Sequence, residues 1–168
     1  IKYAKLSYQE KPENTYALMD LGYAYSESGR FPEAIQAYQE YLQAETDFYN
    51  QLRAKEGLAK VYIKSGESNR AEKMFEELAQ NASNNEEKSD VYKKLSSAFK
   101  LSDDLDKAIH YQEKAVHIAE NSSDNYTYPY GLLELSFLYE QKGNRNEAIS
   151  IMQKVCNIRG ENYDYSHL

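Results

Sequence analysis

The sequence has little cysteine, proline or glycine: its 168 residues include one Cys, three Pro and seven Gly. A single cysteine, Cys156, excludes an internal disulfide, and its place on an apolar helical stripe predicts a buried small side chain. So little Pro and Gly argues against a low-complexity or collagen-like chain. No apolar run approaches the roughly 18 residues of a membrane span, so we expect no membrane insertion.

Positive charge is also in short supply, with 20 Lys and Arg against 27 Asp and Glu and a net charge of −7. This balance argues against a general binder of nucleic acid or of anionic membranes. No signal-peptide pattern appears at the start, so we expect a cytoplasmic location. The sequence begins at Ile1 without Met, which leaves an excised targeting segment open.

Motifs of catalysis and of metal binding are missing as well. The sequence contains no Gly-rich phosphate loop, no HExxH motif and no Cys pair with metal-ligand spacing. His110 and His117 are seven residues apart on one predicted helix, roughly 10 Å along its axis, which is too far to share one metal ion unaided. We therefore expect a protein that is not an enzyme, with no catalytic residues, no metal and no cofactor.

Helical periodicity fills most of the chain, and it is clearest over residues 14–42. A first helix carries an apolar stripe, residues 28–30 interrupt it, and a second helix begins at Pro32, in a first-turn position that suits proline. The first stripe consists of Leu18, Leu21, Gly22 and Tyr25, and the second of Ala34, Tyr38 and Tyr41. This stretch predicts a hairpin of two helices.

The landmarks of this hairpin recur three more times. In each hairpin a small residue lets the second helix approach its neighbours closely. In chain order these residues are Ala34, Ala71, Ala108 and Ala148, at intervals of 37, 37 and 40 residues. The turn residue is Gly29, Gly66 and Gly143, with Asp103 in the third hairpin. Asp tolerates turn geometry, so the third hairpin keeps the pattern.

A Leu-Gly pair followed by an aromatic residue, a Gly and an Ala at these intervals resembles the tetratricopeptide repeat (TPR), whose common period is 34 residues. The resemblance covers about residues 1–158 and implies an all-α, right-handed solenoid of helical hairpins. Repeats lengthened to 37 to 40 residues resemble those of the kinesin light chain and of bacterial TPR regulators that sense peptides. The extra residues predict longer second helices or longer connectors between the hairpins.

The expected organisation is one TPR array of four repeats with an additional element at each end. The repeats are predicted over 14–48, 50–84, 87–121 and 127–159. Residues 1–11 have the pattern of the second helix of a truncated repeat, and 160–168 form a tail or begin another helix. The chain is therefore expected to be a fragment of a longer protein, and its uncapped N-terminal helix could support self-association.

The TPR resemblance implies a concave groove, lined by the first helix of each hairpin, that binds an extended protein or peptide segment. Projection of the helical period onto these helices gives the candidate groove residues. They are Tyr16, Met19, Tyr23, Arg53, Lys60, Lys64, Lys93, Lys100, Tyr130 and Phe137.

Two interpretations of these residues remain open. The central cations could meet carboxylates of a peptide while the flanking aromatic residues hold apolar side chains. Alternatively the lysines form ordinary ion pairs, such as Lys60 with Glu56 and Lys93 with Asp90, and contribute little to binding. The exposed aromatic pairs favour binding more than the lysines do.

Two further functions were weighed against a peptide-binding module. Some TPR domains grip the C-terminal carboxylate of chaperones with Lys and Asn on a first helix, but here Met19 and Tyr23 stand at those places, so chaperone-tail binding is not supported. The alternative function is a sensor or regulatory TPR region of a larger signalling or transcription-regulating protein. An adjacent helix-turn-helix or kinase segment in the full-length gene would favour that alternative.

Overall fold

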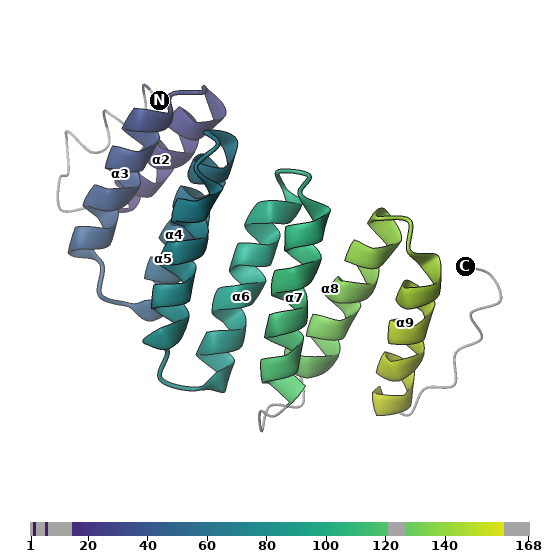
Figure 1. Cartoon of the computed structure of the whole chain (residues 1–168). Helices are drawn as coiled ribbons and strands as arrows, with labels where there is room; N and C mark the ends of the chain where they lie inside the picture. Colours follow the sequence, from purple (N-terminus) through teal and green to yellow (C-terminus); the bar gives the residue numbers. More distant parts are fainter. Residues whose placement is uncertain (1, 3–5, 7–14, 121–126, 160–168) are drawn as a thin grey trace. The chain divides into compact units, whose positions relative to one another are not determined.

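Every regular element in the part of the chain that the structure describes is an α-helix, which confirms the predicted all-α class (Figure 1). This computed structural model describes residues 2, 6, 15–120 and 127–159. The chain divides into two compact units, residues 1–76 and 77–168. The expectations for residues 1–11 and 160–168 fall almost wholly outside the described residues.

The first unit contains helices α2 to α4 and most of α5, which runs past the division. Their bounds are α2 Tyr16–Glu27, α3 Phe31–Ala44, α4 Phe48–Lys64 and α5 Ser68–Gln80. Helix α3 packs on α2 and on α4, and α2 also contacts α4. The two first helices, α2 and α4, are therefore neighbours within this unit.

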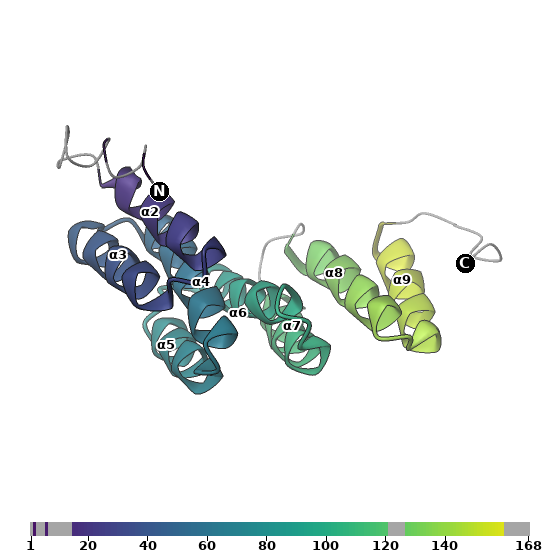
Figure 2. The ribbon, with the colours of Figure 1, turned by 90° about the horizontal axis from the view of Figure 1, so that it is seen from above.

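The second unit repeats the arrangement with two complete hairpins. Its helices are α6 Asn85–Lys100, α7 Leu105–Glu120, α8 Thr127–Gln141 and α9 Arg145–Arg159. Helix α6 pairs with α7, α8 pairs with α9, and α7 packs on α8 (Figure 2). As in the first unit, the two first helices, α6 and α8, also touch each other.

In the second hairpin the extra residues lie in the first helix, where longer second helices or longer connectors were expected. Helix α4 has 17 residues where α2 has 12, and only residues 45–47 connect it to α3. The carboxylate of Asp47 accepts a hydrogen bond of 2.8 Å from the Asn50 amide and so caps α4. Because this cap lies five residues before Leu52, the helix starts earlier than its apolar stripe suggests.

The four turns within the hairpins share one backbone conformation. Gly29, Gly66 and Gly143 have φ angles of +70°, +83° and +86°, and Asp103 has a φ of +62°. This confirms that Asp103 takes the place of the glycine. An L-residue in this left-handed region is strained, and Asp is among those that tolerate it.

The tightest helix contact in the first unit surrounds the ring of Tyr38, a residue that is 4% exposed. A methyl group added at Gly22 on α2 would lie 2.8 Å from the ring, and one added at Gly57 on α4 would lie 2.5 Å from it. Both distances are shorter than any van der Waals contact between carbon atoms. The ring is therefore held between two helices that approach it only because both present glycine.

At the equivalent positions of the other hairpins, different residues are buried between the helices. Ala34, Ala71 and Ala108 are fully buried where the helices meet. The position of Tyr38 is taken by buried Phe75 in the second hairpin and by Gln112 in the third, which is 3% exposed and donates from Nε2 to the carbonyl of Gly131 at 2.9 Å. The buried side-chain amide of Gln112 is therefore hydrogen-bonded, because α8 supplies an acceptor for it.

Cys156 is half-buried, so the prediction of a buried cysteine is wrong. Helix α9 is the last described helix, and the only described element that packs on it is α8. Met152, on the same helix, is half-buried as well.

We predict that Gly57→Ala destabilises the chain although alanine favours helix. Relief of the glycine penalty contributes about 1 kcal/mol, but overpacking against a ring that cannot retreat costs about 1 to 3 kcal/mol. The midpoint of urea unfolding should fall, and adding Tyr38→Leu to Gly57→Ala should restore part of the loss. An unfolding midpoint that rises in Gly57→Ala would contradict this packing.

At the third turn we predict that Asp103→Gly is more stable than Asp103→Ala by about 1 kcal/mol, because alanine meets the steric cost of positive φ and glycine does not. Urea unfolding of the two variants measures the difference. Equal stability of the Ala and Gly variants would show that the turn does not hold this conformation in solution.

Candidate functional site

Large apolar side chains that remain exposed gather on the first helices of the hairpins. In the described part of the chain eight such residues are exposed, and six of them lie on a first helix or at its end. Those six are Tyr16, Tyr23, Tyr49, Leu101, Tyr130 and Phe137; the other two are Leu6 and Ile158. We refer to the exposed sides of α2 and α4 as the first-helix face of the first unit, and to those of α6 and α8 as the first-helix face of the second unit.

The aromatic pairs predicted from the sequence are exposed on the first helices. Tyr16 and Tyr23, on α2, are 57% and 65% exposed, and Tyr130 and Phe137, on α8, are 58% and 47% exposed. Each pair is seven residues apart, so its members lie two turns apart on one side of a helix. Met19, between the first two, is half-buried.

The first-helix face of the first unit has an aromatic and cationic end. The ring of Tyr16 lies 6.2 Å from that of Tyr41, which is buried and donates its hydroxyl to the Glu45 carboxylate at 2.9 Å. Burial and this hydrogen bond raise the pKa of Tyr41 to about 12, and the nearby positive charge of Arg53 partly opposes them. Tyr16 and Arg53 thus both lie near the Tyr41 hydroxyl.

The four candidate lysines all have carboxylate partners. Lys60 pairs with Glu56 at 2.8 Å and Lys93 with Asp90 at 2.5 Å, each within one helix. The other two pairs join neighbouring first helices: Lys64 of α4 with Glu27 of α2 at 2.9 Å, and Lys100 of α6 with Glu134 of α8 at 3.6 Å. The competing explanation for the lysines, ordinary ion pairing, therefore fits each of them.

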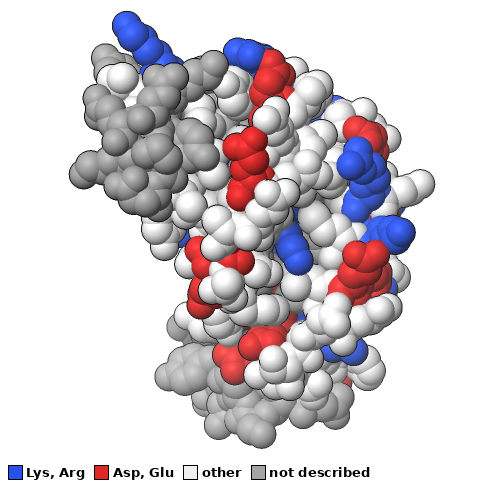
Figure 3. All heavy atoms as spheres, turned by 90° about the vertical axis from the view of Figure 1, so that its left-hand side faces the viewer, with Lys and Arg blue, Asp and Glu red and all other residues white. Residues whose placement is uncertain are grey.

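Arg53 is exposed, and among the described residues no ion pair is found for it. The face seen in Figure 3 has basic and acidic side chains scattered among uncharged ones, with no continuous patch of either sign. Because the four candidate lysines are paired with carboxylates, the first helices are distinguished by their exposed apolar side chains more than by their charge.

Tyr49 was missed by the sequence analysis. It is 49% exposed and lies one turn before Arg53 on the same side of α4. The second repeat was predicted over residues 50–84, so Tyr49 fell between two predicted repeats. The capping signal of Asp47, three residues before Asn50, could have placed it on the helix.

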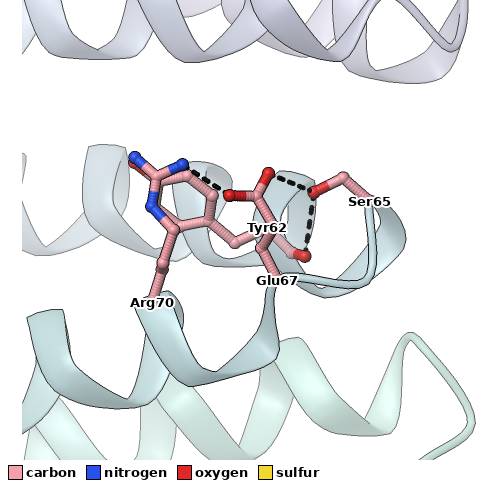
Figure 4. Close-up of polar contacts among 4 residues, drawn as sticks. All are labelled: Tyr62, Ser65, Glu67 and Arg70. Atoms are coloured by element: carbon pink, nitrogen blue, oxygen red, sulfur yellow. Dashed lines mark hydrogen bonds and ion pairs between the residues drawn. The ribbon is translucent and has the colours of Figure 1, made fainter.

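A second recurring feature lies at the hairpin turns, where a cation covers the aromatic ring that ends the first helix. In the second hairpin the guanidinium of Arg70 lies 4.2 Å from the ring centre of Tyr62, bonds to the Glu67 carboxylate at 2.6 Å and donates to the Tyr62 hydroxyl at 3.0 Å (Figure 4). Ser65 completes the cluster by donating to the Tyr62 carbonyl at 3.0 Å. These contacts combine an ion pair with a cation–π interaction.

The first hairpin has the same arrangement with the two charges exchanged. Arg30 stands where Glu67 does, and Glu33 where Arg70 does, yet the guanidinium again lies over the ring, 4.7 Å from the centre of Tyr25. Its Nε donates to Glu33 at 2.9 Å. In the third hairpin Lys107 takes this role, 5.0 Å from the ring centre of Phe99.

The fourth turn lacks the cation. Tyr139 ends α8, but Asn144 and Glu147 occupy the positions of Arg30 and Glu33. The Tyr139 hydroxyl donates instead to the Glu113 carboxylate of α7 at 2.6 Å. Glu113, Tyr139 and Glu147 line a surface hollow of about 380 Å³ between α7, α8 and α9, together with the apolar side chains of Leu135 and Ile151.

Comparison with known proteins supports the repeat pattern. The model of the tetratricopeptide repeat matches residues 3–49, and that of anaphase-promoting complex subunit 5 matches residues 95–168. The repeated landmarks, the hairpin fold and the first of these matches agree. Residues 3–49 therefore match the TPR family, and the chain as a whole has the TPR fold. The search of curated proteins gives no match.

Solved structures share the TPR fold over nearly the whole chain. A putative kinesin light chain of Podosopora anserina with nearly identical TPR-like repeats is 18% identical, with a TM-score of 0.56, covering 94% of this chain and 81% of that one. BtubC (BKLC) from P. vanneervenii is 21% identical, with a TM-score of 0.54 and coverages of 92% and 68%. At these identities the likeness concerns the fold alone.

A third neighbour is a signal transduction ATPase with numerous domains and a tetratricopeptide repeat sensor, from Pyrococcus horikoshii. It is 19% identical, with a TM-score of 0.56, and the match covers 93% of this chain but 24% of that one. In the described residues of this chain, no helix is both long and apolar enough to cross a membrane.

We predict that Tyr139 titrates about two units above an exposed tyrosine. The hydrogen bond to Glu113, burial and the charges of Glu113 and Glu147 raise its pKa from 10.0 to about 12. Because the native pKa lies above the unfolded one, its contribution to stability is complete below pH 10 and is lost as the pH rises toward 12. Carbon-13 NMR of labelled tyrosine rings measures the titration.

Glu113→Gln should lower the pKa of Tyr139 toward 10 and leave that of Tyr41 near 12, because Tyr41 bonds to Glu45 in the other unit. Titration of Tyr139 near pH 10 in the unmodified chain would show that the Glu113 bond does not form in solution.

Proposed function

We propose that this chain is a non-catalytic module that binds extended segments of a partner protein on the first-helix faces of its two units. The observation that carries this function is the gathering of exposed apolar side chains on first helices. Six of the eight large ones in the described residues lie there. Exposed aromatic side chains that cluster on one face are typical of protein-binding surfaces, where Tyr carries much of the binding energy.

The partner's chemistry follows from the charges on these faces. Each candidate lysine is paired with a carboxylate, so its positive charge is already neutralised within the chain. This favours a partner segment that presents apolar or aromatic side chains over one that is strongly acidic. Arg53 supplies one cation near Tyr16 for a single carboxylate or carbonyl of the segment. The overall acidic balance supports a protein partner over nucleic acid.

A sensor region of a larger signalling protein would use the same faces, with binding transmitted to a fused domain. The TPR sensor of the Pyrococcus horikoshii neighbour supports this alternative at the level of fold. A full-length gene that encodes an output domain beside this array would favour the sensor function.

We predict that loss of either aromatic pair weakens binding strongly, while loss of the lysine charges has little effect. A peptide array identifies segments that bind the unmodified chain, and fluorescence anisotropy then measures their affinity for the variants. Tyr16→Ser with Tyr23→Ser, or Tyr130→Ser with Phe137→Ser, should weaken binding by about tenfold or more. Lys60→Gln with Lys93→Gln should change it by less than about threefold.

Ile158→Ser is the matched control, because Ile158 is an exposed apolar residue on second helix α9. It should bind as the unmodified chain does, and circular dichroism should show the same helix content in every variant. Binding that survives both aromatic double variants but fails in the lysine variant would show that the lysines, and not the aromatic pairs, bind the partner segment.

A further inference from the structure

In each of the first three hairpins a basic side chain of the same hairpin covers the aromatic ring at the turn, and in the fourth hairpin this place is not taken by a basic side chain from the equivalent positions. The backbone at the four turns is equivalent: the amides of Arg30, Glu67, Asp104 and Asn144 donate to the carbonyls of Tyr25, Tyr62, Phe99 and Tyr139, at 2.7 to 3.1 Å. At the first three turns a basic side chain then lies over the ring. At the fourth turn none of the side chains at the equivalent positions is basic.

The first hairpin shows what the fourth lacks. Arg30 bonds to Glu33 and covers the ring of Tyr25. Glu147 has the same spacing from Tyr139 that Glu33 has from Tyr25, but Asn144 replaces the arginine. No ion pair of Glu147 is found among the described residues. The carboxylate and the ring are therefore in place without the guanidinium.

The surroundings of Tyr139 suit a guanidinium that enters from outside. The hollow of about 380 Å³ has room for an arginine side chain. Glu113 and Glu147 supply acceptors from two helices, the ring of Tyr139 supplies a π face, and Leu135 and Ile151 offer apolar contact to the methylene groups. A planar guanidinium can bond to a carboxylate with two parallel N–H groups while it stacks on a ring, which an ammonium cannot do.

We propose that the hollow between α7, α8 and α9 receives an arginine side chain of a partner polypeptide. The arginine takes the place that Arg30 fills in the first hairpin, with its guanidinium on the ring of Tyr139 and against Glu147. This docking point lies away from the aromatic side chains of the first-helix face of the second unit, since it is lined by second helices α7 and α9 and by the turn end of α8. It adds a specific requirement, a basic residue, to the binding of a partner.

The experiment uses acetyl-arginine methylamide as the probe, titrated into the whole nitrogen-15-labelled chain at constant ionic strength. We expect saturable NMR shifts at the amides of Tyr139, Glu147 and Ser150. The neutral analogue acetyl-citrulline methylamide should produce no such shifts, and acetyl-lysine methylamide should bind more weakly. Free arginine should also bind more weakly, because its own carboxylate is repelled by Glu113 and Glu147.

Two variants test the geometry. Glu147→Gln should weaken the probe by about fivefold, and Asn144→Arg should abolish its binding by supplying the missing cation from within. Glu140→Gln is the matched control, because Glu140 is an exposed carboxylate on α8 that does not line the hollow. Binding to Glu140→Gln should equal that of the unmodified chain.

The proposal is overturned if the probe gives no saturable shift, if citrulline or free arginine binds as well as the capped arginine, or if Asn144→Arg still binds. Dimerisation that is lost in Glu147→Gln, measured by sedimentation, would place a second copy of the chain here and also overturn it. The Tyr130→Ser and Phe137→Ser variant should keep the arginine response, so failure here is distinct from failure of the first-helix faces.

Discussion

The close approach of helices to the ring of Tyr38 is the constraint on which the first unit depends. The ring lies between Gly22 of α2 and Gly57 of α4, and neither helix could carry a side chain at that point without displacing it. Because α3 holds the ring, this one contact fixes the separation of three helices. The side-by-side position of α2 and α4, and so the first-helix face of this unit, follows from it.

Much of this fold could be predicted from the sequence because its determinants are local and repeated. The positions of Ala34, Ala71 and Ala108, and the turn at Asp103, follow from spacing and steric size. The start of α4 was misplaced because its cap, Asp47, lies well before the apolar stripe. The partial burial of Cys156 depends on which elements pack on α9, and no local sequence pattern reveals that.

The candidate site was predicted only in part, for a similar reason. Helical projection placed Tyr16, Tyr23, Tyr130 and Phe137 correctly on an exposed side. It could not show that Lys64 meets Glu27 or that Lys100 meets Glu134, because those pairs depend on the register between helices. Alignment of the four turns in the sequence shows that the basic residue is missing near Tyr139. The consequence of its absence became clear only from the structure, which places a cation over the aromatic ring at each of the other three turns.

The central claim is that the exposed aromatic residues of the first helices, and not the aromatic residues of the turns, meet the partner segment. Fluorine NMR of the chain labelled with 3-fluorotyrosine, with resonances assigned by single Tyr→Phe changes, tests it most directly. On addition of an array-selected peptide, the signals of Tyr16, Tyr23 and Tyr130 should shift while those of Tyr25 and Tyr62 stay in place. Shifts confined to Tyr25 and Tyr62, with Tyr16, Tyr23 and Tyr130 unmoved, would contradict the account.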